Sequence, residues 1–308
     1  MGYEVIKNIQ DISYEEWVEI RKLYIGGSDA GAICGVNPWA SPASVWLSKQ
    51  EDTEPIPDNE RMRIGRDLED YVAERFSEET GLKVRRNNQM MISKEFPFMM
   101  ANIDREIVGE KSVLECKTTG SYSKDQWEDG NVPDHYYCQV QHYLSVMNYD
   151  KGYIAVLIGN ESFKWYEIPR DDDYIDFMIR KEKEFYNKNM LGGAFPDPDG
   201  TEAYSTALKN LYSNSNSSEI KLDNLSGIVQ DYMTIQAQIK ALKGEQEQLK
   251  QLVQIEMKDN EVASIGENRA IWKEVVSTRF DKKKFEEDYP DLAKNYYYET
   301  TSRRFSVK

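Results

Sequence analysis

Two carboxylates and a lysine occur in a pattern that can support metal-dependent hydrolysis. Asp104, Glu115 and Lys117 all lie within the segment "MMANIDREIVGEKSVLECKTTG". Carboxylate oxygens are the ligands that hard divalent cations prefer. One or two Mg²⁺ ions can lower the pKa of an attacking water and stabilise charge on a phosphate, while a lysine beside them orients the water or neutralises the pentavalent intermediate. The pattern predicts a phosphodiester-hydrolysing site; its alternative is a charged hairpin face in solvent.

The hairpin register decides whether these side chains meet. If Gly109-Glu110 is a two-residue loop, glycine falls at the first central position, as a type II′ turn requires. Val108 then pairs with Lys111, and Asp104 lies opposite Glu115 with Cβ atoms roughly 5 Å apart. Side chains alternate along a strand, so Lys117 shares the face of Glu115. Like charges facing each other destabilise a strand pair, and a divalent cation between them removes that objection.

Two further segments carry polar side chains that can reach this hairpin. Glu69 lies beside the apolar stripe of an expected helix over 61–80. It is either an additional metal ligand or an ordinary charged residue at the edge of the apolar face. Gln139, in "DHYYCQVQHYLSVM", either holds the water or a phosphate oxygen or is ordinary helix surface. His142, one turn later, is expected to face solvent or to be hydrogen-bonded. A histidine-based zinc site is not expected, because the chain has only His135 and His142.

The order of helices and strands predicts an α/β fold with a mixed sheet flanked by helices. Helices are expected from about Tyr14, from Ser41-Pro42, over 61–80, over about two dozen residues ending near Asn148, and from Asp171. Strands are expected at 83–93, 98–108, 112–118, 152–158 and 163–168. A polar, Ser/Asn-rich stretch over 204–218 indicates a linker. We therefore expect a first domain at 1–210 and a C-terminal extension at 211–308.

The extension begins with a long apolar repeat. Apolar residues follow a 3/4 spacing from Leu225 to Val253 that is interrupted only at Gln246. This spacing predicts one long amphipathic helix or a helical hairpin broken at Gly244. Such a helix could pack on its own domain, or it could bind a partner or a second copy of the chain; the sequence favours neither. Alternating residues over 262–280 and 296–307, around a short charged helix at 282–288, predict a small β-containing appendage.

Composition limits the remaining function classes. The 308 residues carry a net charge of −15, of which residues 1–210 contribute −14. Taken alone, this argues against a nucleic-acid binder, because phosphate neutralisation needs Lys and Arg; a bound metal would supply charge that composition does not count. Three dispersed cysteines provide no disulfide framework, zinc ribbon or four-cysteine iron–sulfur cluster. Without a long apolar run or a signal-peptide pattern, a soluble intracellular protein is expected.

The chemistry-bearing residues resemble a known family. In chain order, "WVEIRKLYIGGSDAGAICGVNPWASPASVW", Glu69 in a helix, Asp104, Glu115-Cys116-Lys117 and the Gln-rich "YCQVQHYL" look like the PD-(D/E)-x-K nuclease superfamily. More narrowly they resemble the YqaJ-type viral recombinase group, which is similar to phage lambda exonuclease. The resemblance covers roughly residues 10–190 and implies a restriction-endonuclease-like core. Arg105, directly after Asp104, departs from the more apolar surroundings that are common there.

The resemblance implies a set of metal ligands. Asp104 and Glu115 would bind Mg²⁺, for which Mn²⁺ would substitute, together with the backbone carbonyl of Cys116. Glu69 would belong to an outer acidic set. Lys117 would assist the attacking water.

The resemblance also implies residues that hold the substrate. Gln139 would position the nucleophile. Arg21 and Ser28 are seven residues apart, the spacing at which an Arg and a Ser hold the 5′-phosphate in lambda-like enzymes. The local chemistry agrees, because "GGSD" before a short helix presents N–H groups and arginine adds bidentate charge. Without the family, Ser28 would be interpreted as a plain helix N-cap.

By resemblance, the activity would be 5′→3′ digestion of one strand of linear duplex DNA. The 3′ single-stranded tail would go to a single-strand annealing protein in phage-type recombination, in the cytoplasm of a bacterial host. Lambda-like relatives form trimeric rings, so a homo-oligomer is expected, with no membrane partner. Two alternatives stay open, an endonuclease or end-processing nuclease of the same superfamily and a non-catalytic DNA-binding recombination scaffold.

Overall fold

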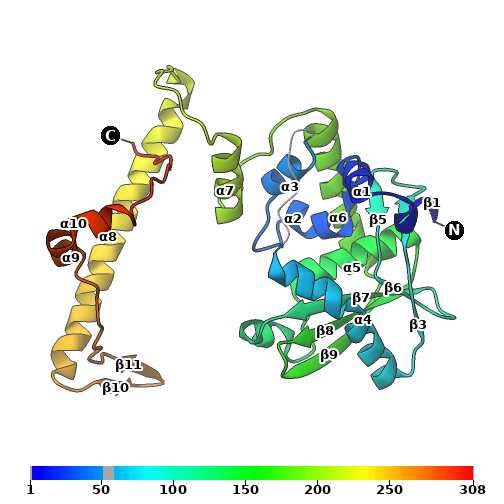
Figure 1. The fold of residues 1–308 in the computed structure, drawn as a ribbon, viewed down its shortest axis with the longest axis horizontal. Helices are drawn as coiled ribbons and strands as arrows, with labels where there is room; N and C mark the ends of the chain where they lie inside the picture. The colour runs from blue at the N-terminus through cyan, green and yellow to red at the C-terminus, as the bar shows by residue number, and fades with distance from the viewer. Residues whose placement is uncertain (1, 51–58, 308) are drawn as a thin grey trace. The chain divides into compact units, whose positions relative to one another are not determined.

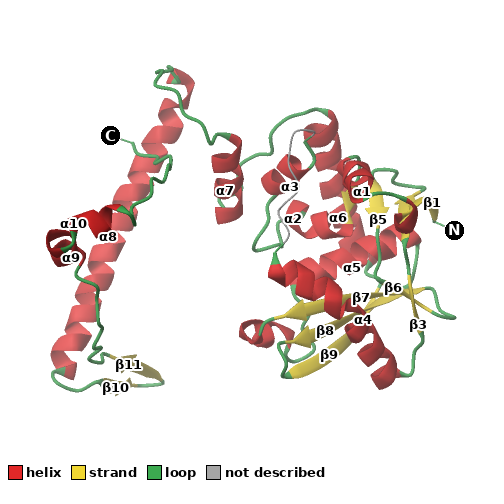
Figure 2. Ribbon diagram, viewed as in Figure 1, coloured by secondary structure: helices red, strands yellow, loops and turns green. Residues whose placement is uncertain are grey.

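The protein is described by a computed structural model over residues 2–50 and 59–307. The chain divides into two compact units, Met1–Tyr212 and Ser213–Lys308. The first unit contains two β-sheets with helices around them (Figures 1 and 2). No helix in the described part of the chain is long and apolar enough to cross a bilayer.

The larger sheet of the first unit carries the predicted hairpin. Its strand order is β3 (Val84–Arg86), β6 (Arg105–Ile107), β7 (Ser112–Thr119), β8 (Lys151–Ile158) and β9 (Ser162–Pro169). Strands β7 and β8 are parallel and the other neighbours are antiparallel. The sheet is therefore mixed, as the sequence predicted. A second sheet has the order β1 (Tyr3–Asn8), β4 (Gln89–Ser93), β5 (Met99–Ala101) and β2 (Ile25–Gly26).

Two helices pack on this mixed sheet through different sets of strand residues. Helix α4 (Glu60–Thr80) buries Val72 and Phe76 in one cluster with Leu114 of β7. Helix α5 (Asp134–Met147) packs in another cluster, where Val140 joins Val113 of β7. Because neighbouring residues of a strand point to opposite faces, α4 and α5 cover opposite faces of the sheet. Odd-numbered residues of β7, including 115 and 117, therefore point toward α5.

The other helices of the first unit surround this core. They are α1 (Tyr14–Lys22), α2 (Gly27–Ile33), α3 (Pro42–Ser48), α6 (Asp172–Phe185) and α7 (Glu202–Leu211). The capping signals in the sequence are used as expected: Ser41 accepts from the backbone N–H of Ser44 with proline at the first turn of α3, and α4 ends at Gly81 in the left-handed region.

Several predicted elements are divided or shortened. The strands expected at 83–93 and 98–108 are each split between the two sheets, β3/β4 and β5/β6. Polar turn residues cause the first break, because the Asn87 side chain accepts from the backbone of Gln89 and competes with strand pairing. The predicted helix of two dozen residues is the 14-residue α5. Positive φ angles at Asp129 and Gly130 and the following Pro133 prevent helix upstream of it.

The hairpin turn differs from the prediction while the register agrees with it. Glu110 donates its backbone N–H to the Ile107 carbonyl at 3.3 Å, and Gly109 is the third residue of that turn with φ +90°. A positive φ at this position is the type II pattern rather than type II′. The loop therefore contains four residues, and Ile107 and Ser112 end the strands. The observed loop is one residue longer on each side than the predicted loop, so the residues that remain in the strands pair as predicted.

The predicted linker at 204–218 is wrong in its first half. Helix α7 occupies this stretch, capped by Thr201, with Tyr204 and Ala207 buried. A Ser-, Asn- and Lys-containing helix forms here because its apolar residues at 3/4 spacing pack on α3 through Ala43. Tertiary contact thus overrides the polar composition.

The second unit consists of one long helix and small appended elements. Helix α8 (Ser226–Met257) is followed by β10 (Val262–Ile265), β11 (Asn268–Ile271), α9 (Lys282–Asp288) and α10 (Pro290–Lys294). The alternative of a hairpin broken at Gly244 is wrong, because α8 runs through this glycine. The alternating residues over 296–307 form no strand.

Candidate active site

The two carboxylates meet at the open end of the β6–β7 hairpin. Arg105 pairs with Leu114, so extending the register by one residue places Asp104 opposite Glu115. Asp104 precedes β6, and its Oδ2 accepts the backbone N–H of Cys116 at 2.8 Å. This hydrogen bond fixes the Asp104 carboxylate beside the middle of β7, one residue from Glu115.

A buried hydrogen-bond network joins Glu115 to its neighbours. Lys117 donates from Nζ to Glu115 Oε1 at 2.6 Å and to Gln139 Oε1 at 3.1 Å. Gln139 donates from Nε2 to Glu115 Oε1 at 2.7 Å and to the Tyr143 hydroxyl oxygen at 2.9 Å. Lys117 also lies over the Tyr136 ring, 4.8 Å from its centroid. The structure therefore brings together four of the predicted residues, Asp104, Glu115, Lys117 and Gln139.

The charges in this network perturb one another. Burial and the neighbouring Glu115 raise the pKa of Asp104 well above its ordinary value. Burial alone would lower the pKa of Lys117, but Glu115 and Asp104 together raise it. The lysine is thus held as a cation beside Asp104, whose charged form is disfavoured. Perturbed groups of this kind are concentrated at functional sites.

The donor set fits a divalent cation. Glu115 Oε2 is buried and has no hydrogen-bond partner, and such an oxygen is costly unless it accepts a hydrogen bond or binds a metal. The charged pair Asp104–Glu115 likewise calls for a cation. The described residues contain no group of three or more His, Cys, Asp or Glu side chains arranged around a metal. Further ligands would therefore have to be backbone carbonyls, such as that of Cys116, or water.

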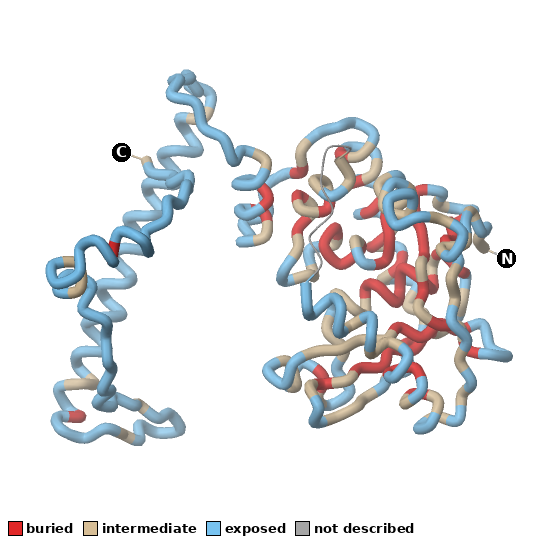
Figure 3. The backbone as a smooth tube through the Cα atoms, viewed as in Figure 1, coloured by how far each residue is buried: buried red, intermediate tan, exposed pale blue. Residues whose placement is uncertain are grey.

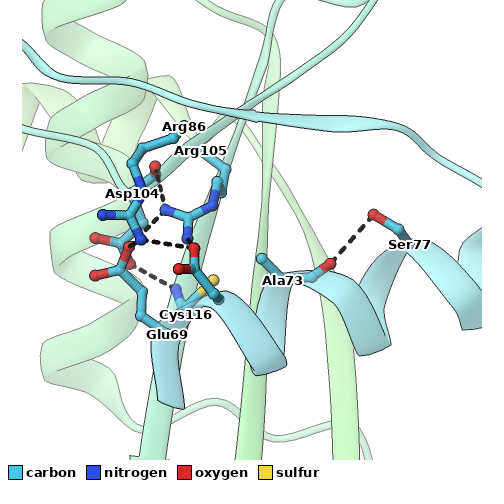
Figure 4. Close-up of polar contacts among 8 residues, drawn as sticks. Glu69, Ala73, Ser77, Arg86, Asp104, Arg105 and Cys116 are labelled. Atoms are coloured by element: carbon cyan, nitrogen blue, oxygen red, sulfur yellow. Dashed lines mark hydrogen bonds and ion pairs between the residues drawn. The ribbon is translucent and has the colours of Figure 1, made fainter. Parts of the chain in front are cut away.

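Glu69 is held by arginines in this structure. Its Oε1 accepts from Arg105 at 2.5 Å and lies 3.6 Å from Arg86 Nη2 (Figure 4). Arg105 also pairs with Asp70 and donates to the Asp104 carbonyl at 2.8 Å. As the partner of Leu114 across the hairpin, Arg105 points to the α4 side, whereas Glu115 points to the α5 side. A metal-binding role for Glu69 stays a prediction, and its observed role is to neutralise Arg105.

Sequence reasoning missed the structural importance of Arg105. Its side chain is only 4% exposed, two residues before the buried Ile107 on the same strand. An arginine at an inward strand position needs an acidic partner. That alternation was the signal in the sequence, and the acidic pair Glu69-Asp70 on the adjacent helix supplies the partner.

The structure places Arg21 beside Ser28. Arg21 Nη2 donates to Ser28 Oγ at 2.9 Å, and the guanidinium stacks on the Trp17 ring at 4.6 Å. Ser28 is not the N-cap of α2, which is Gly26, whose N–H is taken by Asp29 Oδ2 at 2.9 Å. The pair therefore offers one hydroxyl and one guanidinium to an anion.

Small residues in α2 allow this helix to approach α5. A Cβ on Gly27 would lie 2.5 Å from the Tyr143 ring, and one on Gly31 would lie 3.0 Å from His135. Only glycine fits at these distances. The small residues of "GGSDAGA" thus bring Ser28 to the helix that carries Gln139.

Tyr143 links the two groups of residues, and the sequence indicated only an apolar position for it. Its ring packs against Gly27, and its hydroxyl oxygen accepts from Gln139. Burial and the charge of Glu115 raise the pKa of Tyr143, while Arg21 is near enough to oppose that shift. The Arg21–Ser28 pair and the carboxylates therefore lie within one electrostatic environment.

Behind Gln139, α5 is anchored by a fully buried ion pair. His142 Nδ1 lies 2.8 Å from Glu182 Oε1 of α6, and His142 Nε2 lies 3.0 Å from the Met100 carbonyl of β5. Both side chains are 0% exposed. The expected hydrogen-bonded imidazole is confirmed, and the solvent-facing alternative is wrong.

Comparison with known proteins identifies similar sequences and a similar fold. Residues 16–150 match the YqaJ-like viral recombinase domain. The chain is 42% identical over 312 residues to the uncharacterized protein YqaJ of Bacillus subtilis (strain 168), covering 99% of this chain and 97% of that protein. The crystal structure of an alkaline exonuclease from Laribacter hongkongensis is similar at 19% identity and a TM-score of 0.50, over 58% of this chain and 93% of the exonuclease. The predicted PD-(D/E)-x-K fold is thereby confirmed.

Proposed function

The chain belongs to the YqaJ-like viral recombinase family, and we propose that it is a Mg²⁺-dependent exonuclease that digests one strand of linear duplex DNA from 5′ to 3′. The observation that carries this proposal is the buried set of Asp104, Glu115 and Lys117, in which Glu115 Oε2 has no hydrogen-bond partner. Such a set is suited to a hard cation and to phosphodiester hydrolysis.

Each residue of the set has a role that its contacts allow. Asp104 and Glu115 would hold Mg²⁺ with the Cys116 carbonyl. A bound Mg²⁺, or Mn²⁺ in its place, would lower the pKa of the attacking water and stabilise charge on the phosphate. Lys117, held as a cation, would place its ammonium beside the phosphate oxygens, and Gln139 would orient the water. Since both donate to Glu115 Oε1, that oxygen is oriented while Oε2 is left for the metal.

Arg21 and Ser28 would give the enzyme its direction. A terminal 5′-phosphate carries more negative charge than an internal phosphodiester, so a guanidinium with a hydroxyl favours the 5′ end. After each cleavage, binding of the new 5′-phosphate by Arg21 and Ser28 would place the next scissile bond at the carboxylates. We extend the proposal to a trimeric ring, to a single-strand annealing recombinase that takes the 3′ tail, and to the cytoplasm of a bacterial host.

The proposed activity is tested with three DNA substrates in Mg²⁺. Linear duplex with 5′-phosphates, linear duplex with 5′-hydroxyls and a closed circle of the same sequence are incubated with the protein. Digestion of linear DNA only, faster with the 5′-phosphate, supports the proposal. Cutting of the circle would favour an endonuclease, and the absence of digestion in Mg²⁺ and Mn²⁺ would favour a DNA-binding scaffold.

Replacing Arg21 with alanine should slow digestion selectively. Hydrogen bonds to charged groups contribute about 1.5–3 kcal/mol, so we expect a rate about 10- to 100-fold lower on 5′-phosphorylated ends and little change on 5′-hydroxyl ends. Arg75→Ala, which removes a half-buried arginine paired with Glu78 on α4, is the control. Equal slowing on both kinds of end would contradict the phosphate-binding role.

Lys117→Ala should separate cleavage from binding. Loss of a charged group that assists proton transfer or charge neutralisation reduces rates by about 10²–10⁴-fold. Binding to duplex ends, measured by fluorescence anisotropy without divalent metal, should change far less because the Arg21–Ser28 pair is intact. Turnover close to that of the wild type would remove Lys117 from the proposed mechanism.

A further inference from the structure

Helix α8 exposes a long apolar stripe. Ile228 is 66% exposed, Ile235 54%, Leu242 63% and Leu249 65%. Figure 3 shows the same helix, placed by its label in Figure 1, exposed along nearly its whole length. Among the described residues of Ser213–Lys308, only Met257 and Ala293 are buried apolar residues. A unit of this size needs a core, and a lone helix in water is marginal, so this unit requires a partner surface.

The stripe has the seven-residue repeat of a coiled coil. With a positions at 225, 232, 239, 246 and 253 and d positions three residues after each, the apolar pattern is broken only at Gln246 and at the final d position, Glu256. A 3.5-residue repeat sustained over four heptads is the pattern by which helices wrap around each other. The helix is about 48 Å long at 1.5 Å per residue. The chain's own C-terminal segment touches this stripe at Tyr232, whose ring lies 5.8 Å from that of Phe305, and leaves the positions above exposed.

The charges beside the stripe identify the occupant and its direction. The e positions carry Lys243 and Lys250, whereas the g positions carry Asp231 and Glu245. In a parallel pair of identical helices, g faces the e position five residues later in the other copy, so Glu245 meets Lys250. In an antiparallel pair, e faces e and g faces g, so the lysines at e positions do not face the acids at g positions. The flanking charges therefore favour a parallel second copy of the same helix.

Gln246 supports the same arrangement. In a parallel pair the two Gln246 side chains lie in one layer and can hydrogen-bond to each other, which sets the register. In an antiparallel pair each Gln246 would face an apolar layer without a partner, which is costly for a buried amide. We propose that α8 associates with α8 of a second copy of this chain as a parallel coiled coil. The contact lies within Ser213–Lys308 and does not depend on the nuclease activity.

Cysteine cross-linking of the full chain tests the proposal. In a parallel coiled coil the Leu249→Cys thiols at a d position face each other, whereas Gln248→Cys thiols at an outward c position do not. We expect mild oxidation to give a covalent dimer in L249C several-fold faster than in Q248C or in the wild-type chain, on non-reducing gels. Equal rates in L249C and Q248C across the concentrations tested would overturn the proposal.

A charge exchange gives a second readout that simple unfolding cannot imitate. In the L249C background, Lys250→Glu places like charges against Glu245 of the other copy and should slow cross-linking. Adding Glu245→Lys restores opposite charges and should restore the rate, while circular dichroism reports unchanged helix content. A double variant that cross-links no faster than the Lys250→Glu variant would overturn the parallel alignment.

Discussion

The Asp104→Asn variant is expected to lose at least about 10³-fold of its DNA-digesting activity and yet to unfold at a higher temperature than the wild type when divalent metal is absent. Asparagine keeps an oxygen that can accept the Cys116 N–H, observed at 2.8 Å, but it removes the charge that opposes Glu115. Relief of about 1 kcal/mol would raise the unfolding temperature by about 2–4 °C in a unit of this size. A gain in stability together with a loss of activity is the result expected if these carboxylates bind metal.

The raised pKa of Asp104 also predicts how the stability difference between Asp104→Asn and the wild type changes with pH. Burial and Glu115 raise the pKa of Asp104 in the folded protein, so folding favours its protonated form. That contribution is fully present below the unfolded pKa of about 3.9 and is lost as the pH rises through the folded pKa. The stability advantage of Asp104→Asn should therefore be largest at neutral and alkaline pH and should shrink as the pH falls toward 4.

Calorimetry in a chelator and digestion assays in Mg²⁺ check the two halves of the prediction. Asp176→Asn, which changes an exposed residue on α6, is the matched control and should leave both unchanged. An Asp104→Asn variant that is clearly less stable than the wild type in chelator would show that the carboxylate has a structural rather than a metal-binding role.

The largest loss of stability is expected for His142→Ala. This change leaves Glu182, whose side chain is 0% exposed, without its cationic partner, and removing one member of a buried ion pair costs about 3–5 kcal/mol. Denaturant unfolding followed by tryptophan fluorescence measures the effect. The buried pair joins α5 to α6 and to β5, so its loss should also loosen the helix that carries Gln139 and Tyr143.

The contribution of this pair to the stability of the wild-type protein should decrease as the pH rises. Burial alone would lower the pKa of His142, but the Glu182 carboxylate raises it above its ordinary value. The stabilisation is therefore fully present below about pH 6.5 and is lost as the pH rises through the folded pKa. The difference between wild type and His142→Ala should be greater at pH 6 than at strongly alkaline pH.

Replacing both members of the pair separates charge from packing. The double variant His142→Leu with Glu182→Leu buries no charge and should lose less stability than His142→Ala alone, as found for other buried pairs exchanged for apolar residues. If His142→Ala unfolds within about 0.5 kcal/mol of the wild type, the ion pair contributes no net stability and the interpretation is wrong.

Much of the candidate site could be predicted because it depends on local geometry. Strand alternation and a hairpin register together place Asp104 opposite Glu115 and Lys117 beside it, and the register is the one observed although the turn is of another type. The position of Gln139 followed from helical spacing on α5. These relations involve residues that are close in sequence or joined by one turn, so few alternatives compete with them.

Other features were beyond a single sequence because they depend on which surfaces meet. The partners Glu69 and Arg105 are 36 residues apart, and nothing in either segment says that α4 covers the face of β6 opposite to Glu115. Tyr143 is indistinguishable from a core residue until Gly27 packs against its ring. The linker expected at 204–218 became helix α7 for the same reason, since burial against α3 outweighs polar composition.

The sequence by itself thus determined the types and spacing of the candidate site residues, the hairpin register and the seven-residue repeat of α8, because side-chain type and backbone periodicity are local properties. The tertiary structure alone decided which charges are neutralised. It assigned Glu69 to Arg105, Glu182 to His142 and Glu115 to Lys117, and it left Glu115 Oε2 without a partner. A charge in a folded protein is stabilised by whatever packing brings within a few ångströms, and that is settled only when helices and sheets come together.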